Sequence, residues 1–403
     1  AYSSSSGSSE WNHNEAAVQQ CKEFNCPSES LEKALPSSKM LLTSVSLLNG
    51  GLAEHVQALK PDMVLCDAFF PAGSLVSEII GVPCVTSCSS HFFGREERDR
   101  IMGFLRDLDY NQESCTLLEK KYGISYDAAD TFCNYSDYTI CWTVPQFDTS
   151  AETNSIQRPQ VHFWGACWPA DIEAKQQGLD EVRGGFSLTA LKQRKVEGDT
   201  ILYCSMGTLL GSNPDAADST PVFSNLIQLY GGKPKTTLVL SVGKKYDLKK
   251  LGKKLPCNVM IARSVPQKQV LELADVFITH AGSNSVNEAL FQGCGMVCVP
   301  VFGSQLINAK QVQALDCGLF ISNPDKSGFC KQGLSHVTST ELKKKIDEVL
   351  RSKERAAACE HMQTKLQSRH AFLHQRAMNE LASYIIASES DTSSKGPHHW
   401  KGI

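Results

Sequence analysis

Residues 276–290 read VFITHAGSNSVNEAL, and this stretch says more about the chain than any other. An apolar strand is predicted at 276–278, followed by a turn of small residues and a helix that opens at Asn284. The start of a helix presents backbone N–H groups that have no intrahelical partner, and such groups bind phosphate. Glu288 follows one turn later on the same face, where a carboxylate accepts hydrogen bonds from ribose hydroxyls. The stretch therefore predicts a site for a diphosphate and a ribose.

A longer segment around this stretch resembles a known family. It is similar to the donor-binding signature of the UDP-sugar-dependent glycosyltransferases, which include animal glucuronosyl/glucosyltransferases, plant small-molecule glycosyltransferases and bacterial macrolide glycosyltransferases. The pieces that match in order and spacing are Val265-Pro266-Gln267, Thr279-His280-Ala281-Gly282, Asn284-Ser285, Glu288, Gly293, Pro300 and Gln305. Residues 201–209 (ILYCSMGTL) and 61–71 (PDMVLCDAFFP) resemble strands of the donor and acceptor domains of the same family.

The resemblance implies an α/β fold of two Rossmann-like domains facing a cleft, the GT-B architecture of glycosyltransferase family 1, with the first domain N-terminally incomplete. A length of 403 residues also exceeds what one hydrophobic core serves, and the second half alternates strand and helix patterns as parallel sheets do. We expect a mobile polar segment at 1–35, an acceptor-binding domain at 36–170, a linker at 171–198, a UDP-sugar donor-binding domain at 199–352, helices at 353–387 that pack back on the first domain, and a disordered tail at 388–403.

The activity that the resemblance implies is an inverting, metal-independent transfer of a hexosyl group. The donor is a UDP-sugar, which acts as a co-substrate, and the acceptor is a hydroxyl of a small lipophilic molecule. No cofactor is expected. The sixteen cysteines are scattered without zinc spacing, so no metal site is expected either.

Charge and hydropathy exclude other classes of partner. The net charge is −3 and there is no long basic run, which argues against nucleic-acid binding. No apolar run is long enough to form a transmembrane segment, so we expect a cytoplasmic protein. The alternative is a fragment of a membrane-anchored enzyme of the ER lumen, for which Asn134-Tyr135-Ser136 is a candidate glycosylation acceptor.

The resemblance also assigns roles in the donor site. His280 is expected to donate to the diphosphate, Glu288 to bind the ribose and Gln267 to contact the uracil edge. Asn284 and Ser285 are expected at the phosphates, although both also suit a plain helix cap. Taken alone, without the surrounding motif, His280 would be interpreted as a structural histidine at the end of a strand. Glu288 would likewise be interpreted as a solvent-exposed helix residue. Further expected donor contacts are Ser205, Gly207, Thr208, Val265, Gly282 and Ser283.

Three positions are expected to affect how the uracil base and the sugar of the donor are recognised. Ser264 stands where relatives usually carry a Trp that stacks on uracil, so we expect the base to be held differently. Ser304 stands where an Asp or Glu usually binds sugar hydroxyls, which leaves the donor sugar open. Gln305 matches the family glutamine that reads sugar hydroxyls.

Asp67 resembles the aspartate of the family's catalytic dyad. That aspartate orients a histidine that deprotonates the acceptor hydroxyl, whereas the simpler interpretation of Asp67 is a strand-end cap. Relatives carry the histidine in the first strand-to-helix turn, and we find no equivalent in residues 1–60. His91 follows a predicted strand and is a secondary candidate for the base. The alternative function is a non-catalytic UDP-sugar-binding pseudoenzyme, or a partial chain that needs an upstream segment or a partner chain for the histidine.

Overall fold

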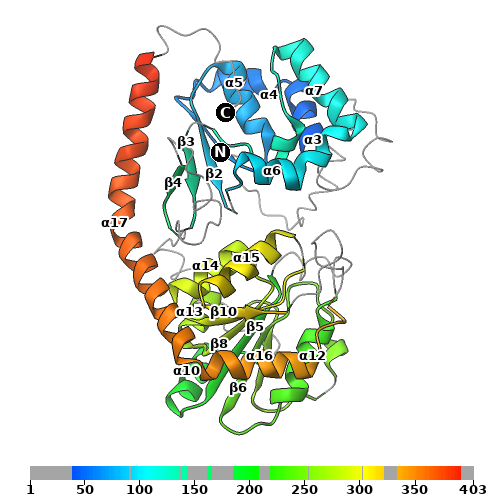
Figure 1. Ribbon diagram of the computed structural model, residues 1–403, viewed down its shortest axis with the longest axis vertical. Coiled ribbons are helices and arrows are strands. Elements are labelled where there is room, and N and C mark those ends of the chain that lie inside the picture. Colours follow the sequence, from blue (N-terminus) through cyan, green and yellow to red (C-terminus); the bar gives the residue numbers. More distant parts are fainter. Residues whose placement is uncertain are drawn as a thin grey trace. The chain divides into compact units, whose positions relative to one another are not determined.

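The computed structural model describes residues 39–89, 92–136, 138–143, 161–165, 185–207, 218–252, 254–301, 303–321 and 334–391. The described residues form two compact units, each with its own parallel sheet (Figure 1). The first unit contains residues up to 141 together with 161–162 and the chain from 376 onwards, and the second contains 142–143 and 163–375.

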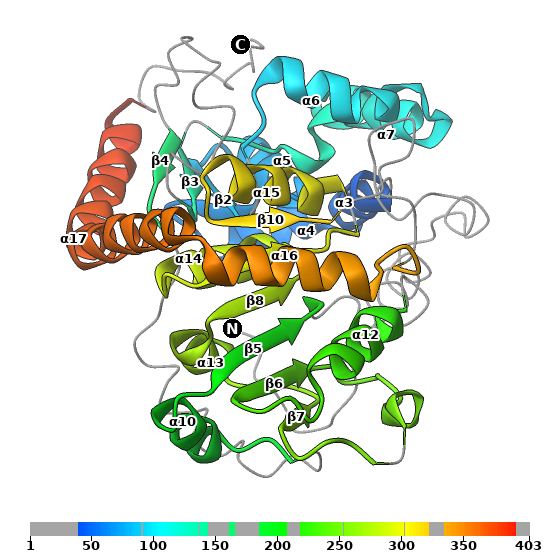
Figure 2. The same ribbon diagram turned by 60° about the horizontal axis from the view of Figure 1, so that its bottom comes forward.

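The second unit is built on a six-stranded sheet in the order β10-β9-β8-β5-β6-β7, whose neighbours are all parallel (Figure 2). The strands are β5 (Thr200–Ser205), β6 (Thr236–Ser241), β7 (Val259–Ala262), β8 (Val276–Thr279), β9 (Gly295–Cys298) and β10 (Gly318–Phe320). Strand β8 is buried at all four positions, as expected for a parallel strand with helices on both faces.

Two groups of helices cover this sheet. On one face lie α10 (Leu188–Val196), α13 (Gln267–Leu273), α14 (Ser283–Phe291), α15 (Gly303–Ala314) and the first part of α17 (Lys353–Asp391). On the other face lie α12 (Thr220–Tyr230) and α16 (Ser339–Arg351), near the short 3-10 helix η4 (Leu248–Leu251). Side chains alternate between the faces, so Tyr203 of β5 joins the first core whereas Leu202 and Cys204 join the second.

The chain reverses its direction of travel across the sheet next to β5. It passes from β5 outward to β6 and β7, then returns to β8 on the opposite side of β5 and continues to β9 and β10. Open parallel sheets bind ligands at the carboxyl ends of the two strands that flank such a reversal. The fold therefore places a candidate site where β5 ends at Ser205 and β8 ends at Thr279.

The first unit has a four-stranded sheet in the order β1-β2-β3-β4. Its strands are β1 (Val64–Asp67), β2 (Cys84–Cys88), β3 (Tyr138–Cys141) and β4 (Val161–Phe163), and the pairs β1/β2 and β2/β3 are parallel. Its helices are α3 (Lys39–Asn49), α4 (Leu52–Ala58), α5 (Pro71–Ile80), α6 (Arg95–Met102), η1 (Gly103–Asp107), α7 (Asp109–Tyr122) and η2 (Ala128–Phe132). Residues of α3, α5 and α7 form its core, including Leu41, Leu75 and Leu118.

Several elements differ from the sequence patterns. The apolar stretch that opens the first unit forms two helices, α3 and α4, because Gly51 between them takes a left-handed φ of 89°. The segment expected as a linker holds α10, whose N-cap is Ser187 and whose Leu191 is fully buried in the second unit. Helix α17 continues to Asp391, and within the first unit its Tyr384 ring lies 4.9 Å from the ring of Tyr138.

Asn134, the candidate glycosylation acceptor, is buried. Its Nδ2 donates to the carbonyl oxygens of Ala68 and Thr131, and its Oδ1 accepts from the Tyr126 hydroxyl at 2.6 Å. The folded first unit therefore leaves no room for a glycan on this side chain. Within the described part of the chain, no helix combines the length and apolar character needed to cross a membrane.

Candidate functional site

His280 lies at the carboxyl end of β8, between two glycines. A Cβ atom added to Gly207 would lie 2.4 Å from Nε2 of His280, and one added to Gly282 would lie 2.5 Å from the same atom. Gly207 also takes a left-handed φ of 82° at the end of β5. Both positions therefore need glycine, because only glycine leaves space for the imidazole beside the two strand ends.

The imidazole of His280 is held neutral. Burial lowers its pKa from 6.5 to about 4, and a hydrogen bond to the backbone of Ser205 opposes this shift only in part. Nδ1 is buried and has no hydrogen-bond partner among the residues that the structure describes. A buried ring nitrogen without a partner is costly unless a ligand supplies one.

Helix α14 begins beside this ring. Its N-cap is Gly282, no side chain caps the helix, and the first intrahelical bond runs from Val286 N to Gly282 O. The N–H groups of residues 283–285 have no acceptor within the described ranges. They form the electropositive end of a nine-residue helix, which suits an anion.

The turn before α14 is strained and braced. Ala281 takes a left-handed φ of 63°, which costs a residue with a Cβ about 1–2 kcal/mol. Asn308 of α15 holds the turn, since its Nδ2 donates to Ala281 O at 2.7 Å and to Ser283 Oγ at 3.2 Å. These two bonds fix the turn between His280 and the start of α14.

Glu288 belongs to a hydrogen-bonded chain with three other side chains. Nε2 of Gln267 donates to Oε2 of Glu288 at 2.7 Å and to Oγ of Ser285 at 3.3 Å. The Tyr203 hydroxyl donates to Oε1 of Gln267 at 2.9 Å. Burial raises the pKa of Glu288, while Gln267 and the charge of Lys268 lower it. The carboxylate is thus fixed about one helical turn from the start of α14.

The remaining expected donor residues occupy different environments. Val265 is 7% exposed, whereas Ser264 next to it and Asn284 at the helix start are exposed. Gln305 is buried, and its Oε1 accepts from Val301 N at 2.9 Å, which closes the loop before α15. Ser205 ends β5, and its Oγ lies 3.5 Å from Gly207 N.

The other expected residues lie either outside the described part of the chain or in the first unit. Thr208, His91 and the side chain of Ser304 lie outside the described residues. Asp67 ends β1 in the first unit; it is exposed, and its Oδ1 accepts from Phe69 N at 2.8 Å. That bond is the strand-end cap of the simpler interpretation, and Oδ2 keeps no partner among the described residues.

The sequence alone missed two residues of the site, Tyr203 and Asn308. Tyr203 looks like an ordinary apolar residue of β5, and Asn308 like a polar residue in the middle of a helix. Asn308 is 1% exposed, and a buried amide requires hydrogen-bond partners. A polar residue on the apolar face of α15 was the only available signal.

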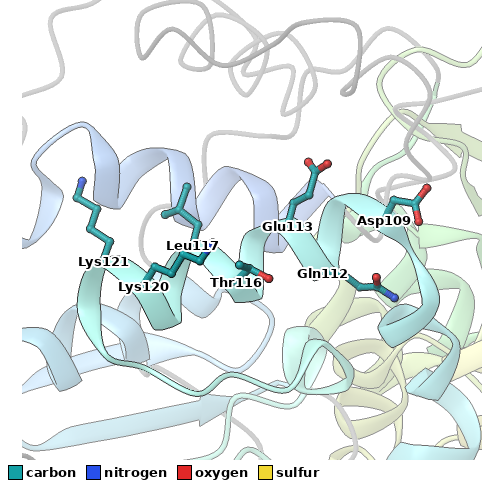
Figure 3. A pocket seen from close by; sticks show the side chains of 7 residues that line it. All are labelled: Asp109, Gln112, Glu113, Thr116, Leu117, Lys120 and Lys121. Atoms are coloured by element: carbon teal, nitrogen blue, oxygen red, sulfur yellow. The ribbon is translucent and has the colours of Figure 1, made fainter.

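A hollow of about 910 Å³ lies elsewhere, along α7 of the first unit. Its lining side chains follow one another along this single helix (Figure 3): Asp109, Gln112, Glu113, Thr116, Leu117, Lys120 and Lys121. It is an open groove on the first unit with both signs of charge, and we assign it no ligand. Across the described residues, no group of three or more His, Cys, Asp or Glu side chains is arranged to hold a metal ion.

Comparison with known proteins identifies the family. The model of the family described as UDP-glucoronosyl and UDP-glucosyl transferase matches residues 203–358. The Bacillus subtilis protein called Uncharacterized UDP-glucosyltransferase YdhE is 32% identical over 309 residues, which are 73% of this chain and 67% of the relative. The chain belongs to this UDP-glycosyltransferase family.

Further matches place this UDP-glycosyltransferase among its relatives. Uncharacterized UDP-glucosyltransferase YojK, also from Bacillus subtilis, is 26% identical over 287 residues, 68% of this chain and 64% of the relative. The chain thus spans about two thirds of the length of these two relatives. The crystal structure of the glycotransferase of kitacinnamycin shares its fold with a TM-score of 0.66 at 21% identity, covering 85% of this chain and 81% of that one. The α/β fold with two Rossmann-like parallel-sheet units is the GT-B architecture.

Proposed function

We propose that this UDP-glycosyltransferase transfers a hexosyl group, with inversion and without a metal, from a UDP-sugar to a hydroxyl of a small lipophilic acceptor. The observation that carries the proposal is the meeting of three features at the ends of β5 and β8. These are the uncapped start of α14, the partnerless Nδ1 of His280 and the fixed carboxylate of Glu288. Together they complement a diphosphate followed by a ribose.

The diphosphate of the donor would accept hydrogen bonds from the N–H groups of residues 283–285 and from His280. As the glycosidic bond breaks, negative charge grows on the leaving UDP, and donors already aimed at that position stabilise it without reorganising. A bound diphosphate would favour the imidazolium, whose two N–H groups donate to the backbone of Ser205 and to the diphosphate at the same time. These groups supply the electrophilic assistance in the proposed mechanism, so it routes no step through a metal.

The acceptor hydroxyl needs a general base, because a neutral alcohol attacks poorly. We assign Asp67 the role of orienting that base: Oδ1 is engaged by Phe69 N, and Oδ2 is available to accept from an imidazole N–H. A histidine from an upstream segment or from a partner chain would complete the dyad. The attack on the anomeric carbon then proceeds from the side opposite UDP and inverts the configuration.

A second function is favoured by the same contact at Asp67. The bond from Phe69 N is what a carboxylate makes when it only caps a strand end, so a non-catalytic UDP-sugar-binding protein is the alternative. Both functions share the donor site in the second unit and differ only in turnover.

Calorimetry with UDP, followed by incubation of the protein, joined to an upstream segment that supplies the histidine, with radiolabelled UDP-glucose and a panel of phenols and sterols, separates these functions. We expect UDP binding and a labelled product that is lost in Asp67→Asn. UDP binding without product from any acceptor supports the non-catalytic alternative. Absence of UDP binding contradicts both, since both depend on the donor site.

A further inference from the structure

The amide of Gln267 has no donor left over for a nucleobase. Its two N–H bonds point to Oε2 of Glu288 and to Oγ of Ser285, and its Oε1 accepts from Tyr203. Glu288 as a carboxylate only accepts, so Nε2 of Gln267 must face it and Oε1 must face the phenol. The amide orientation follows from its partners on both sides.

Tyr203 is placed to enforce this orientation. It is fully buried in the middle of β5, and its ring stacks on Phe277 with centroids 4.8 Å apart and planes 8° apart. Burial raises the pKa of the phenol far above its usual value, against hydrogen bonds from the side chains of Ser205 and Ser241 that lower it. The phenol therefore keeps its proton and donates it to Gln267, at the end of a side chain that packing does not allow to move.

The chain of bonds ends on the carboxylate of Glu288, the group to which the proposed function assigns the ribose. Gln267 occupies Oε2 of Glu288, and Oε1 has no partner among the described residues. A carboxylate held at one oxygen presents the other in a fixed direction, with its lone pairs available to the ribose hydroxyls. Without Gln267 the carboxylate would be both freer to rotate and harder to keep ionised, because burial already raises its pKa.

We propose that Tyr203 and Gln267 are positioning residues for ribose recognition: Tyr203 orients the Gln267 amide, and Gln267 fixes the Glu288 carboxylate instead of reading the uracil edge. The proposal rests on donor binding at this site. It differs from the role that the family resemblance implies for Gln267, because both N–H groups of the amide are already engaged within the protein.

Three ligands separate the possible roles: UDP, 2′,3′-dideoxyuridine diphosphate, which lacks the hydroxyls that Glu288 would bind, and CDP, which differs only in the base. The variants are Tyr203→Phe and Gln267→Met, which remove hydrogen bonds with little change in volume. Tyr230→Phe is the matched control, because the Tyr230 hydroxyl is buried in the same unit without a partner among the described residues. Dissociation constants are measured by calorimetry, and folding is checked by thermal unfolding.

We expect Tyr203→Phe to bind UDP about fivefold to tenfold more weakly, which is the loss of one neutral hydrogen bond. We expect Gln267→Met to bind UDP about tenfold to a hundredfold more weakly, because its lost bond is to a carboxylate, and both variants to bind the dideoxy ligand as wild type does. The preference for UDP over the dideoxy ligand therefore falls by the same factor in each variant, while the preference for UDP over CDP stays constant. Tyr230→Phe changes neither ratio. A merely structural defect would weaken all three ligands together and leave the ratios intact.

Two results overturn the proposal. One is an unchanged preference for UDP over the dideoxy ligand in variants that fold and bind. The other is a changed preference for UDP over CDP in Gln267→Met, which would make Gln267 a base reader. If Tyr203→Phe does not fold, Gln267→Met alone decides between these outcomes. Failure of the wild-type protein to bind UDP is a distinct result, because it removes the donor site itself and this proposal with it.

Discussion

Lowering the pH should destabilise the protein through His280. The pKa of this imidazole is 6.5 when unfolded and about 4 in the folded second unit, because burial disfavours the charged ring. Between these two values the unfolded chain binds a proton that the folded chain does not, so stability falls as the pH falls. Above about pH 7 both states are neutral, and below about pH 4 both are charged, so the loss is confined to this window.

The size of the effect follows from the shift. A pKa difference of 6.5 to about 4 costs roughly 3 kcal/mol once the pH is below both values, and about 2 kcal/mol of that is lost between pH 7.5 and pH 5. The perturbation that isolates it is His280→Asn, which keeps a polar side chain but removes the titration. Other groups titrate in both proteins, so their contributions cancel in the difference between wild type and variant.

Guanidinium unfolding at the two pH values measures this difference. We expect the wild-type protein to lose about 2 kcal/mol more than His280→Asn on acidification to pH 5. Saturating UDP should reduce the loss, since a bound diphosphate favours the imidazolium. A wild-type loss that matches the variant loss within about 0.5 kcal/mol would refute the reasoning, because a ring that protonates normally cannot be buried as described.

Three further predictions concern other contacts. Gly207→Ala should lower stability by about 1–3 kcal/mol more than Gly198→Ala, because both glycines have similar positive φ but only the first would clash with His280; equal midpoints in urea would contradict this. Glu288→Gln should weaken UDP binding about tenfold to a hundredfold by calorimetry, as a hydrogen bond to a charged group is lost; an unchanged dissociation constant would remove the ribose assignment. Asn134→Ala should lower the free energy of unfolding of the first unit by about 2–3 kcal/mol in urea, since it leaves buried hydrogen-bond partners unpaired. An unchanged free energy of unfolding would contradict the role of these buried bonds.

The geometry of the candidate donor site was predictable, because its main features are local. The strand, the turn and the helix of residues 276–290 lie next to each other in the chain, so their spacing alone indicates an anion site. The alternating pattern of the second half also predicted its parallel sheet. The pattern did not predict strand β10, because Gly318–Phe320 is only three residues long and begins with a glycine.

What the sequence did not predict depends on contacts between distant residues. The role of Gln267 follows from Tyr203, which is 64 residues away, and nothing in the sequence near either residue reports that bond. Gln305 reads as a sugar contact by position, yet its Oε1 is taken up by Val301 N. Similarly, the sequence did not predict α10, because this segment is rich in Gly and Pro and resembles a linker. The helix is stabilised by burial of Leu191 against the second unit, which the local sequence does not report.

The reversal between β5 and β8 determines when, during synthesis of the chain, the second unit can form its candidate site. Half of the donor pocket is synthesised at the beginning of this unit and the other half well after β7, so no growing chain can hold a nucleotide until both have emerged and paired. A nucleotide bound there favours only the completed sheet, by mass action. If the site binds a sugar nucleotide as proposed, the supply of that ligand also lowers the fraction of unfolded polypeptide that proteases can attack.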